Sequence, residues 1–246
     1  MKHFRISVPI APVRLQPSDS AELVTQFLYG EPVEVIYEKA QWRACKSLID
    51  GYEGFVDEKL LSPDHPDRIW SDDLLREPVS WWETPEGLRL LPAGARVISS
   101  SDPSPKQPST AEIVSYAMNF LGAPYLWGGK SILGIDCSGL TQVVFAVHGI
   151  ALPRDAKQQV SSGTPVDFIQ LAHEGDLAFF GPEPDRITHV GILIRASEKS
   201  ENAAEWNILH ASGEVRIDVL DHQGIYRTDR KTYTHDLRAI RRIIAG

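Results

Sequence analysis

The chain has only two cysteines and no long apolar segment among its 246 residues. Cys45 and Cys137 lie far apart, which excludes the dense disulfide framework of small secreted domains. No apolar run approaches the roughly 20 residues that a membrane-spanning helix needs, so we expect no membrane as partner. The N-terminal segment alternates apolar and polar residues and lacks the unbroken apolar core of a signal peptide. We therefore expect a cytoplasmic protein, with export as the alternative if a leader preceded Met1.

Basic residues are also in deficit, with 25 Lys and Arg against 33 Asp and Glu and a net charge of −8. Domains that bind nucleic acid usually carry a basic patch, and the only such cluster here is Arg238, Arg241 and Arg242 near the C-terminus. We therefore expect no nucleic acid as partner. A content of 42% hydrophobic and 24% charged residues is typical of a globular protein, and the length allows one large or two modest domains.

Short alternating strands separated by turn residues predict a small all-β barrel over residues 4–62. Two further strands, at 79–82 and 88–98, are expected to extend this barrel. Cys45 lies within one of the barrel strands and is expected to be a small core residue. Three tryptophans of the extension are expected in the core or, alternatively, against the second domain: Trp70, Trp81 and Trp82.

A linker rich in Pro and Ser, residues 101–109, divides the chain into an N-terminal domain (1–100) and a second domain (110–246). The second domain is expected to begin with a helix capped by Ser109 or Thr110 and stopped by Gly122. After Gly175 the pattern changes to strands, expected at 176–180, 189–195, 207–211, 215–220 and 237–244. Helices followed by antiparallel strands predict an α+β fold.

A second helix of this domain is expected to begin at Cys137, with Asp136 as its N-cap. Its apolar positions follow at helical spacing: Leu140, Val143, Val144 and Val147. A cysteine in the first turn lies close to unpaired backbone N–H groups and to the positive end of the helix dipole, both of which favour a thiolate. The same N–H groups can hold an oxyanion. From this segment alone, a nucleophile and a small buried core residue are equally good interpretations of Cys137.

Two of the eight histidines lie in strands that are otherwise apolar, His189 and His210. A nucleophilic cysteine needs a base and a group that orients the base, and these histidines are expected in those roles. The other histidines are expected at the surface, in polar loops or at a helix end: His3, His65, His148, His173, His222 and His235. The spacings between Cys137, His189 and His210 match no zinc signature, so we expect no metal and no cofactor.

The second domain resembles the NlpC-type cysteine peptidases, a compact papain-like family that cuts peptide bonds of bacterial peptidoglycan. The matching segments are residues 125–129 (YLWGG), 136–140 (DCSGL), 152–154 (LPR), 175–177 (GDL), 188–192 (THVGI) and 208–211 (ILHA). The resemblance implies Cys137 as nucleophile, His189 as base and His210 as the third polar residue. It also places the hydroxyl of Tyr125 beside the nucleophile.

The N-terminal domain resembles the bacterial SH3-like domain at residues 30–35, 42–44 and 50–56, with Phe55 where that family usually has Trp. Together the two domains are similar to γ-D-glutamyl-L-diamino acid endopeptidases, which cut short murein peptides carrying a free N-terminal L-Ala and serve peptide recycling. Four residues are implied to bind the substrate, the first three around its amine: Tyr125, Asp136, Ser138 and Asp155.

Several alternatives stay open. The same chemistry can act outside the cell on intact peptidoglycan, with the SH3-like domain as a wall anchor, or the chain can be a non-catalytic protein that binds wall peptides. Diaminopimelate and lysine both fit as the diamino acid, and the oligomeric state is open. An SH3-like residue is expected to complete the amine pocket, with three candidates: Tyr52, Glu53 and Trp82.

Overall fold

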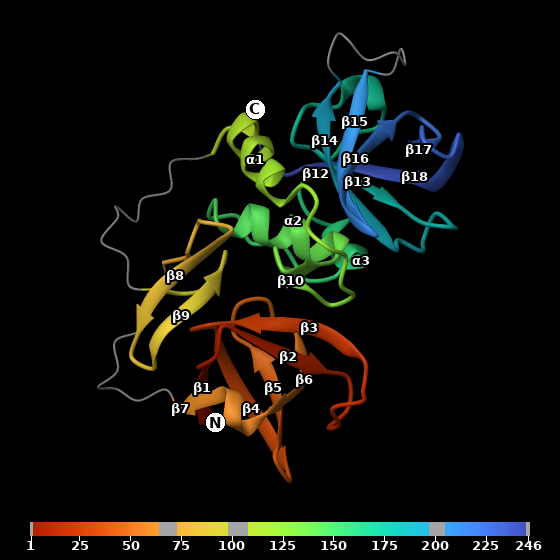
Figure 1. Ribbon diagram of the computed structural model, residues 1–246. Coiled ribbons are helices and arrows are strands. Elements are labelled where there is room, and N and C mark those ends of the chain that lie inside the picture. Colours follow the sequence, from red (N-terminus) through yellow and green to blue (C-terminus); the bar gives the residue numbers. More distant parts are fainter. Residues whose placement is uncertain (1, 64–72, 98–107, 197–204, 245–246) are drawn as a thin grey trace. The chain divides into compact units, whose positions relative to one another are not determined.

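A computed structural model describes residues 2–63, 73–97, 108–196 and 205–244 of the chain. The chain divides into two compact units, and each is described here by itself (Figure 1). One unit comprises residues 1–104 and 126–134, and the other comprises 105–125 and 135–246. Most of the expected linker, Trp70 and His65 lie outside the described residues.

The first unit contains a sheet of seven short strands, as the alternating pattern predicts. The strands are β1 (Lys2–Ile6), β2 (Ile10–Arg14), β3 (Leu23–Leu28), β4 (Pro32–Lys39), β5 (Trp42–Ser47), β6 (Glu53–Asp57) and β7 (Leu61–Pro63), with the 3-10 turn η1 (Glu58–Leu60) before the last. Their order in the sheet is β3-β2-β6-β5-β4-β1-β7. Residues that alternate along these strands form one apolar core: Ile6, Ala11, Val13, Phe27, Val33, Val35, Cys45 and Val56. Cys45 is fully buried in this core, as predicted.

The expected extension of the barrel is wrong in one respect. Strands β8 (Val79–Thr84) and β9 (Gly87–Pro92) pair with each other in a separate two-stranded sheet. This hairpin is joined to the barrel by packing, because Leu91 lies in a small core with Tyr29, whose hydroxyl donates to Glu86. Trp82 packs against that core, whereas its neighbour Trp81 points the other way and is 64% exposed.

The segment 126–134 belongs to the first unit although both of its ends continue into the second. The indole N–H of Trp127 donates to Glu22 over 2.8 Å, and the backbone N–H of Lys130 donates to the Gln26 side chain over 2.8 Å. The Lys130 ammonium lies 3.8 Å from Glu31, and both side chains are buried. The motif that follows Tyr125 is therefore fixed to strand β3 and to the turn after it.

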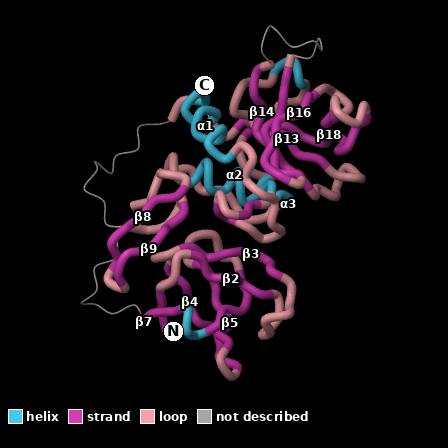
Figure 2. Tube along the Cα trace, in the orientation of Figure 1, coloured by secondary structure: helices cyan, strands magenta, loops and turns pink. Residues whose placement is uncertain are grey.

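The single helix predicted at the start of the second unit is present, and its last turn is a 3-10 turn. Helix α1 (Thr110–Ala117) starts at a capping box, in which Ser109 accepts from the Glu112 N–H and Glu112 accepts from the Ser109 N–H. The 3-10 turn η2 (Met118–Phe120) follows, and Gly122 ends it with a φ of +80°, a conformation that favours glycine. Figure 2 shows the few helices of this unit, α1 among them, in cyan beside its strands.

The remaining elements of this unit form a seven-stranded sheet with two short helices. The helices are α2 (Cys137–Ala146) and α3 (Ala156–Gln159), with the 3-10 turn η3 (Ile169–Leu171). The short pair β10 (Lys130–Ser131) and β11 (Gly134–Ile135) belongs to the first unit except for Ile135. The sheet strands are β12 (Thr164–Pro165), β13 (Leu177–Phe180), β14 (His189–Arg195), β15 (Trp206–Ser212), β16 (Glu214–Leu220), β17 (Gly224–Arg227) and β18 (Thr232–Arg242). Their order is β12-β18-β13-β14-β15-β16-β17, and β17 also pairs with β18. The predicted α+β fold is confirmed.

The last two strands differ from the prediction. Strand β17 is not predicted at all, and β18 begins at Thr232 instead of at residue 237. The first residues of β18 are polar and mostly exposed, so they lack the alternation that marks a half-buried strand. Pairing with β17 supplies the hydrogen bonds that make this segment a strand.

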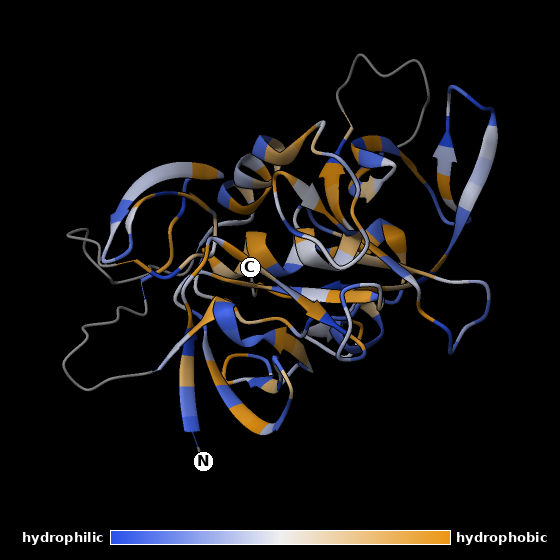
Figure 3. Ribbon diagram, turned by 60° about the horizontal axis from the view of Figure 1, so that its bottom comes forward, coloured by the Kyte–Doolittle hydropathy of each residue, from blue (hydrophilic) through white to orange (hydrophobic). Residues whose placement is uncertain are grey.

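Helix α2 is covered on all sides, since each of its residues from Cys137 to Phe145 is buried. It packs on strands β14 and β15, the central strands of the sheet. Both strands are mostly apolar and buried. Figure 3 colours the chain by hydropathy and shows orange apolar stretches alternating with blue hydrophilic ones along the ribbon. In the described ranges, no helix combines the length and the apolar character required to cross a membrane.

Candidate active site

Cys137 lies at the first position of helix α2, as predicted, with its side chain 7% exposed. Asp136 caps the helix, because its Oδ1 accepts from the Gly139 N–H over 2.7 Å. The backbone N–H groups of Val190 and Ser138 face the Cys137 thiol closely enough to lower its pKa. The sulfur therefore lies against strand β14, directly beside the residue that follows His189.

The helix N-terminus does not by itself make Cys137 a thiolate. Burial, together with the charge of Asp136, raises the pKa of the Cys137 thiol to about 12. The two backbone donors act in the opposite direction but are outweighed. The resting group is a neutral thiol, so formation of the nucleophile requires a base that takes its proton.

His189 and His210 are in direct contact on neighbouring strands β14 and β15. The Nε2 of His189 lies 2.8 Å from the Nδ1 of His210, and the two rings are nearly perpendicular at 82°. Burial, followed by the adjacent His210 and His235, lowers the pKa of His189 well below its usual value. His189 is therefore a neutral imidazole with Nε2 engaged, and its other nitrogen, Nδ1, can accept a proton.

The close approach of the two histidine strands depends on Gly191. A Cβ at this position would lie 2.6 Å from the Ile208 side chain and 2.9 Å from the Cβ of His210. Such distances are too short for any side chain, so only glycine permits this packing. Gly191 thus lets the strands of His189 and His210 approach each other, and Val190, the residue after His189, faces the Cys137 thiol. The catalytic roles of Cys137, His189 and His210 stay predictions.

Asp218 continues the chain of polar contacts, and the sequence gives little sign of it. Its Oδ2 lies 3.0 Å from the Nε2 of His210, and Arg216 donates to both of its oxygens over 2.8 Å. Burial alone would raise the pKa of Asp218, but hydrogen bonds from His210 and Arg216 lower it to about 2. Asp218 lies between Ile217 and Val219 and alternates with apolar residues of β16 as an exposed strand residue would, so the sequence does not distinguish it.

His235 also belongs to this cluster, and its predicted position at the surface is wrong. Its ring stacks on that of His189 at 4.3 Å and 24°. Burial and the neighbouring His210 lower the pKa of His235 to about 4, so it is neutral over most of the pH range. The cause is the early start of β18, which carries His235 to the face of His189.

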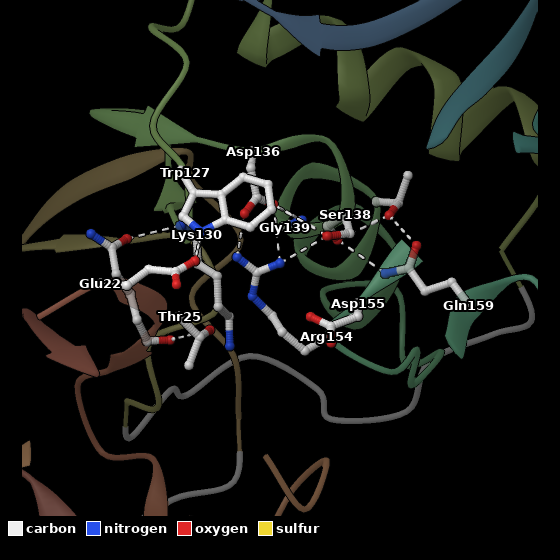
Figure 4. A network of polar contacts seen from close by, with 12 residues as sticks. Glu22, Thr25, Trp127, Lys130, Asp136, Ser138, Gly139, Arg154, Asp155 and Gln159 are labelled. Atoms are coloured by element: carbon white, nitrogen blue, oxygen red, sulfur yellow. Dashed lines mark hydrogen bonds and ion pairs between the residues drawn. The ribbon is translucent and has the colours of Figure 1, made fainter. Parts of the chain in front are cut away.

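Asp136 and Ser138 are joined by a buried arginine, as Figure 4 shows. Arg154 is 2% exposed; its Nη2 donates to Asp136 Oδ2 over 2.6 Å, and its Nη1 donates to Asp136 Oδ1 over 3.0 Å and to Ser138 Oγ over 2.9 Å. Gln159 holds the next turn by donating to the Ser138 carbonyl over 3.0 Å. The Asp136 carboxylate therefore caps the helix and pairs with Arg154 at the same time.

Tyr125 and Asp155 are more exposed than the other predicted residues. Burial, followed by the charges of Cys137 and Asp136, raises the pKa of Tyr125 to about 12, so its hydroxyl keeps its proton near the sulfur. Asp155 is the N-cap residue of α3, and its carboxylate lies 3.6 Å from the mostly exposed ammonium of Lys157. Within the described ranges, no group of three or more His, Cys, Asp or Glu side chains is arranged to hold a metal ion.

Comparisons with known proteins agree with this geometry. Residues 122–234 match the model of the NlpC/P60 family, and residues 13–61 match that of the bacterial dipeptidyl-peptidase Sh3 domain. A γ-D-glutamyl-L-lysine dipeptidyl-peptidase of Bacillus subtilis (strain 168) is 32% identical over 206 residues, which cover 69% of each chain. A dipeptidyl-peptidase 6 of Lysinibacillus sphaericus is 27% identical over 88% of this chain and 92% of its own.

The fold has a similar counterpart among solved structures. A crystal structure of an NlpC/P60 family protein from Bacillus cereus ATCC 10987 aligns over 99% of this chain and 100% of its own with a TM-score of 0.80. The sequence identity in that alignment is 22%, so it supports the fold alone. The two family matches and the identity with the B. subtilis relative lead to one conclusion: the chain belongs to the NlpC/P60 family and is a cysteine peptidase with an N-terminal SH3-like domain.

Proposed function

We propose that this peptidase hydrolyses the γ-D-glutamyl-L-diamino acid bond of short murein peptides with a free N-terminal L-Ala, in the cytoplasm, as a step of peptide recycling. The observation that carries the chemistry is the contact chain in which His189 lies between the Cys137 segment and His210. The substrate class is supported by the B. subtilis relative, which is named for γ-D-glutamyl-L-lysine and matches 69% of this chain.

In the proposed reaction, His189 Nδ1 takes the proton of Cys137 as the sulfur attacks the γ-carbonyl carbon of D-Glu. The C–S bond forms, and the carbonyl oxygen becomes an oxyanion held by the Cys137 backbone N–H and the Tyr125 hydroxyl, which keeps its proton. The oxyanion then collapses, the C–N bond breaks, and the leaving amine takes the proton from His189. Water, deprotonated by His189, hydrolyses the thioester and releases L-Ala-γ-D-Glu.

The charges of the buried groups require that this proton moves within the Cys–His pair. Burial disfavours the thiolate of Cys137 and the imidazolium of His189 when either is formed alone. When both form together, each charge stabilises the other. Substrate binding also excludes water, which strengthens this attraction in the site.

Recognition of the free amine is proposed to rest on Tyr125, Asp136, Ser138 and Asp155. The charge of Asp136 is already balanced by Arg154 across two hydrogen bonds. The ion pair of Asp155 is with an exposed lysine at 3.6 Å, and surface pairs of this kind are weak. Asp155 is therefore the carboxylate with more charge to offer to an ammonium group, while Asp136 and Ser138 offer hydrogen-bonding oxygens.

The decisive experiment compares three substrates with the full chain: L-Ala-γ-D-Glu-L-Lys, the same tripeptide with an acetylated amine, and intact sacculi. We expect L-Ala-γ-D-Glu from the free tripeptide and a rate about 10- to 100-fold lower after acetylation, because one charge-assisted contact is lost. A diaminopimelate tripeptide assayed beside the lysine form determines the preferred diamino acid. Release from sacculi without cleavage of the tripeptide would instead establish the exported, wall-cutting alternative.

Labelling with iodoacetamide separates an enzyme from a non-catalytic binding protein. Cys45 is the matched control, because burial raises its pKa to about 12 as well and it lies in the barrel core. We expect Cys137 to react much faster than Cys45 near neutral pH, since it has a neutral imidazole within reach. Equal rates would contradict the peptidase mechanism.

A further inference from the structure

We infer that Asp218, clamped by Arg216, is a positioning residue for the reaction: through His210 it fixes the tautomer of His189 that leaves Nδ1 free to take the thiol proton. The inference rests on the proposed roles of Cys137 and His189. It adds Asp218 and Arg216 to the contact chain of Cys137, His189 and His210. Both lie on strand β16, outside the sequence motifs that the family resemblance rests on.

The first step concerns His210, which lies between two fixed partners. An ionised carboxylate only accepts hydrogen bonds, so the His210 Nε2 that lies 3.0 Å from Asp218 Oδ2 must carry a proton. A neutral imidazole has one protonated nitrogen, so the Nδ1 of His210 is an acceptor. Both rings are buried, and no bulk water competes for these contacts.

The second step carries this constraint to His189. Its Nε2 lies 2.8 Å from the acceptor Nδ1 of His210 and must therefore donate, which places the His189 proton on Nε2. Nδ1 of His189 then holds the lone pair. The opposite tautomer would need His210 to donate at both nitrogens, and so would bury a positive charge between His189 and Asp218.

Arg216 keeps Asp218 ionised, so that Asp218 orients His210 without taking its proton. Its Nε and Nη2 bind the two carboxylate oxygens over 2.8 Å each, the two-point geometry that guanidinium and carboxylate favour. These bonds and the contact with His210 bring the pKa of Asp218 to about 2 despite its burial. Arg216 also balances the charge of Asp218, whose Oδ2 faces the Nε2 of His210.

Other ionisable groups that face His189 do not impose this tautomer. Cys137 on α2 and His235 on β18 are neutral at rest, and Phe180 on β13 is apolar. His235 stacks on the ring face of His189, and its own Nδ1 lies 2.9 Å from the Thr234 hydroxyl. Asp218, acting through His210, therefore determines which nitrogen of His189 carries the proton.

The inference predicts a direct spectroscopic signature in the unaltered full chain. With ¹⁵N-labelled histidine, His189 and His210 should both show the tautomer protonated at Nε2 at pH 7.5. Signals are assigned by His189→Gln and His210→Gln. A proton on Nδ1 of His189 in the resting enzyme would overturn the inference, and this measurement needs neither substrate nor a variant of Asp218.

The kinetic test uses Asp218→Asn, whose amide offers either an oxygen or an NH₂ group to His210 and so permits both tautomers. We expect kcat on the free tripeptide to fall about 10- to 100-fold with KM within about twofold, and Cys137 alkylation to slow in parallel. Asp218→Glu, which keeps a carboxylate, should recover part of the loss. Asp221→Asn, at an exposed turn carboxylate of the same unit, is the control and should leave both rates unchanged.

Unchanged kcat, alkylation and ¹⁵N spectrum in a folded Asp218→Asn chain would refute the positioning role. If Asp218→Asn does not fold, Arg216→Gln provides the second variant, with the same expected direction because the carboxylate loses its two-point clamp. Failure of the proposed substrate appears differently, since the wild-type chain would then leave the tripeptide uncut while its ¹⁵N signature and its alkylation remain measurable.

Discussion

Arg154 should be the most sensitive single position for the stability of the peptidase unit. It is among the largest fully buried side chains, and it makes three hydrogen bonds, two with Asp136 and one with Ser138. Arg154→Met keeps most of the aliphatic volume and removes the guanidinium. The Asp136 side chain, which is 8% exposed, then loses the guanidinium and keeps the hydrogen bonds from the Gly139 N–H and the Ser138 hydroxyl.

The expected cost follows from removing one partner of a buried ion pair. Such a change typically lowers the free energy of unfolding by about 3–5 kcal/mol, because the remaining charge stays buried without its counter-charge. For a unit of this size the loss corresponds to a fall in Tm of roughly 10 °C. Asp136→Asn should cost a similar amount by stranding Arg154, although asparagine still caps the helix about as well as aspartate.

The double variant Arg154→Met/Asp136→Asn distinguishes this explanation from simple loss of packing. It buries no unpaired charge, so its cost should fall short of the sum of the single costs by more than about 2 kcal/mol. The measurement is hydrogen exchange of the α2 amides together with thermal unfolding. The control is Arg195→Met, which removes an exposed pair with Glu205 and should cost less than about 1 kcal/mol. Single costs that add within about 0.5 kcal/mol would refute the proposed coupling.

Three further outcomes are expected. The free energy of unfolding should fall by on the order of 1–3 kcal/mol as the pH drops from 6.5 toward 4, because folding lowers the pKa values of His189 and His235 and the unfolded chain therefore takes up these protons first. Urea unfolding at a series of pH values checks this, and a stability that does not change with pH would contradict it. Lys130→Met should destabilise the first unit by about 3 kcal/mol by stranding buried Glu31, and Lys130→Met/Glu31→Gln should recover much of it in a thermal melt. Gly191→Ala should displace His210 and reduce kcat by a larger factor than it changes KM, with a stability cost of about 1–3 kcal/mol. Full activity in this variant would show that the close contact between the strands is not needed.

The parts of the site that the sequence predicts are those determined locally. Asp136 and Cys137 are found because an N-cap and the apolar periodicity after it lie within one short segment. His189 and His210 are found because each interrupts an apolar strand, and consecutive antiparallel strands usually lie side by side. In these cases, the local pattern already determines the neighbours.

The parts that the sequence misses depend on pairing between distant or irregular strands. His235 lies in a polar run that becomes a strand only by pairing with β17, so no alternation marks it. Asp218 alternates with apolar residues as an exposed strand residue would, and only the packing of β16 beside β15 brings it to His210. The attachment of residues 126–134 to the first unit likewise rests on side-chain contacts that no local pattern contains.

Two Asp–Arg pairs, one at the start of α2 and one on β16, help to explain how the proposed catalytic pair can be both buried and reactive. Arg154 balances Asp136 at the start of α2, and Arg216 balances Asp218 behind His210. Each carboxylate orients a group by accepting hydrogen bonds, the helix start in one case and the histidine chain in the other. Arg154 offsets part of the effect of the Asp136 charge on Cys137, and Arg216 balances the charge of Asp218 beside His210. The ionisation of the Cys–His pair is then governed mainly by burial and by the attraction between its own two charges, so a bound substrate that excludes water favours the ionised pair at the moment it is needed.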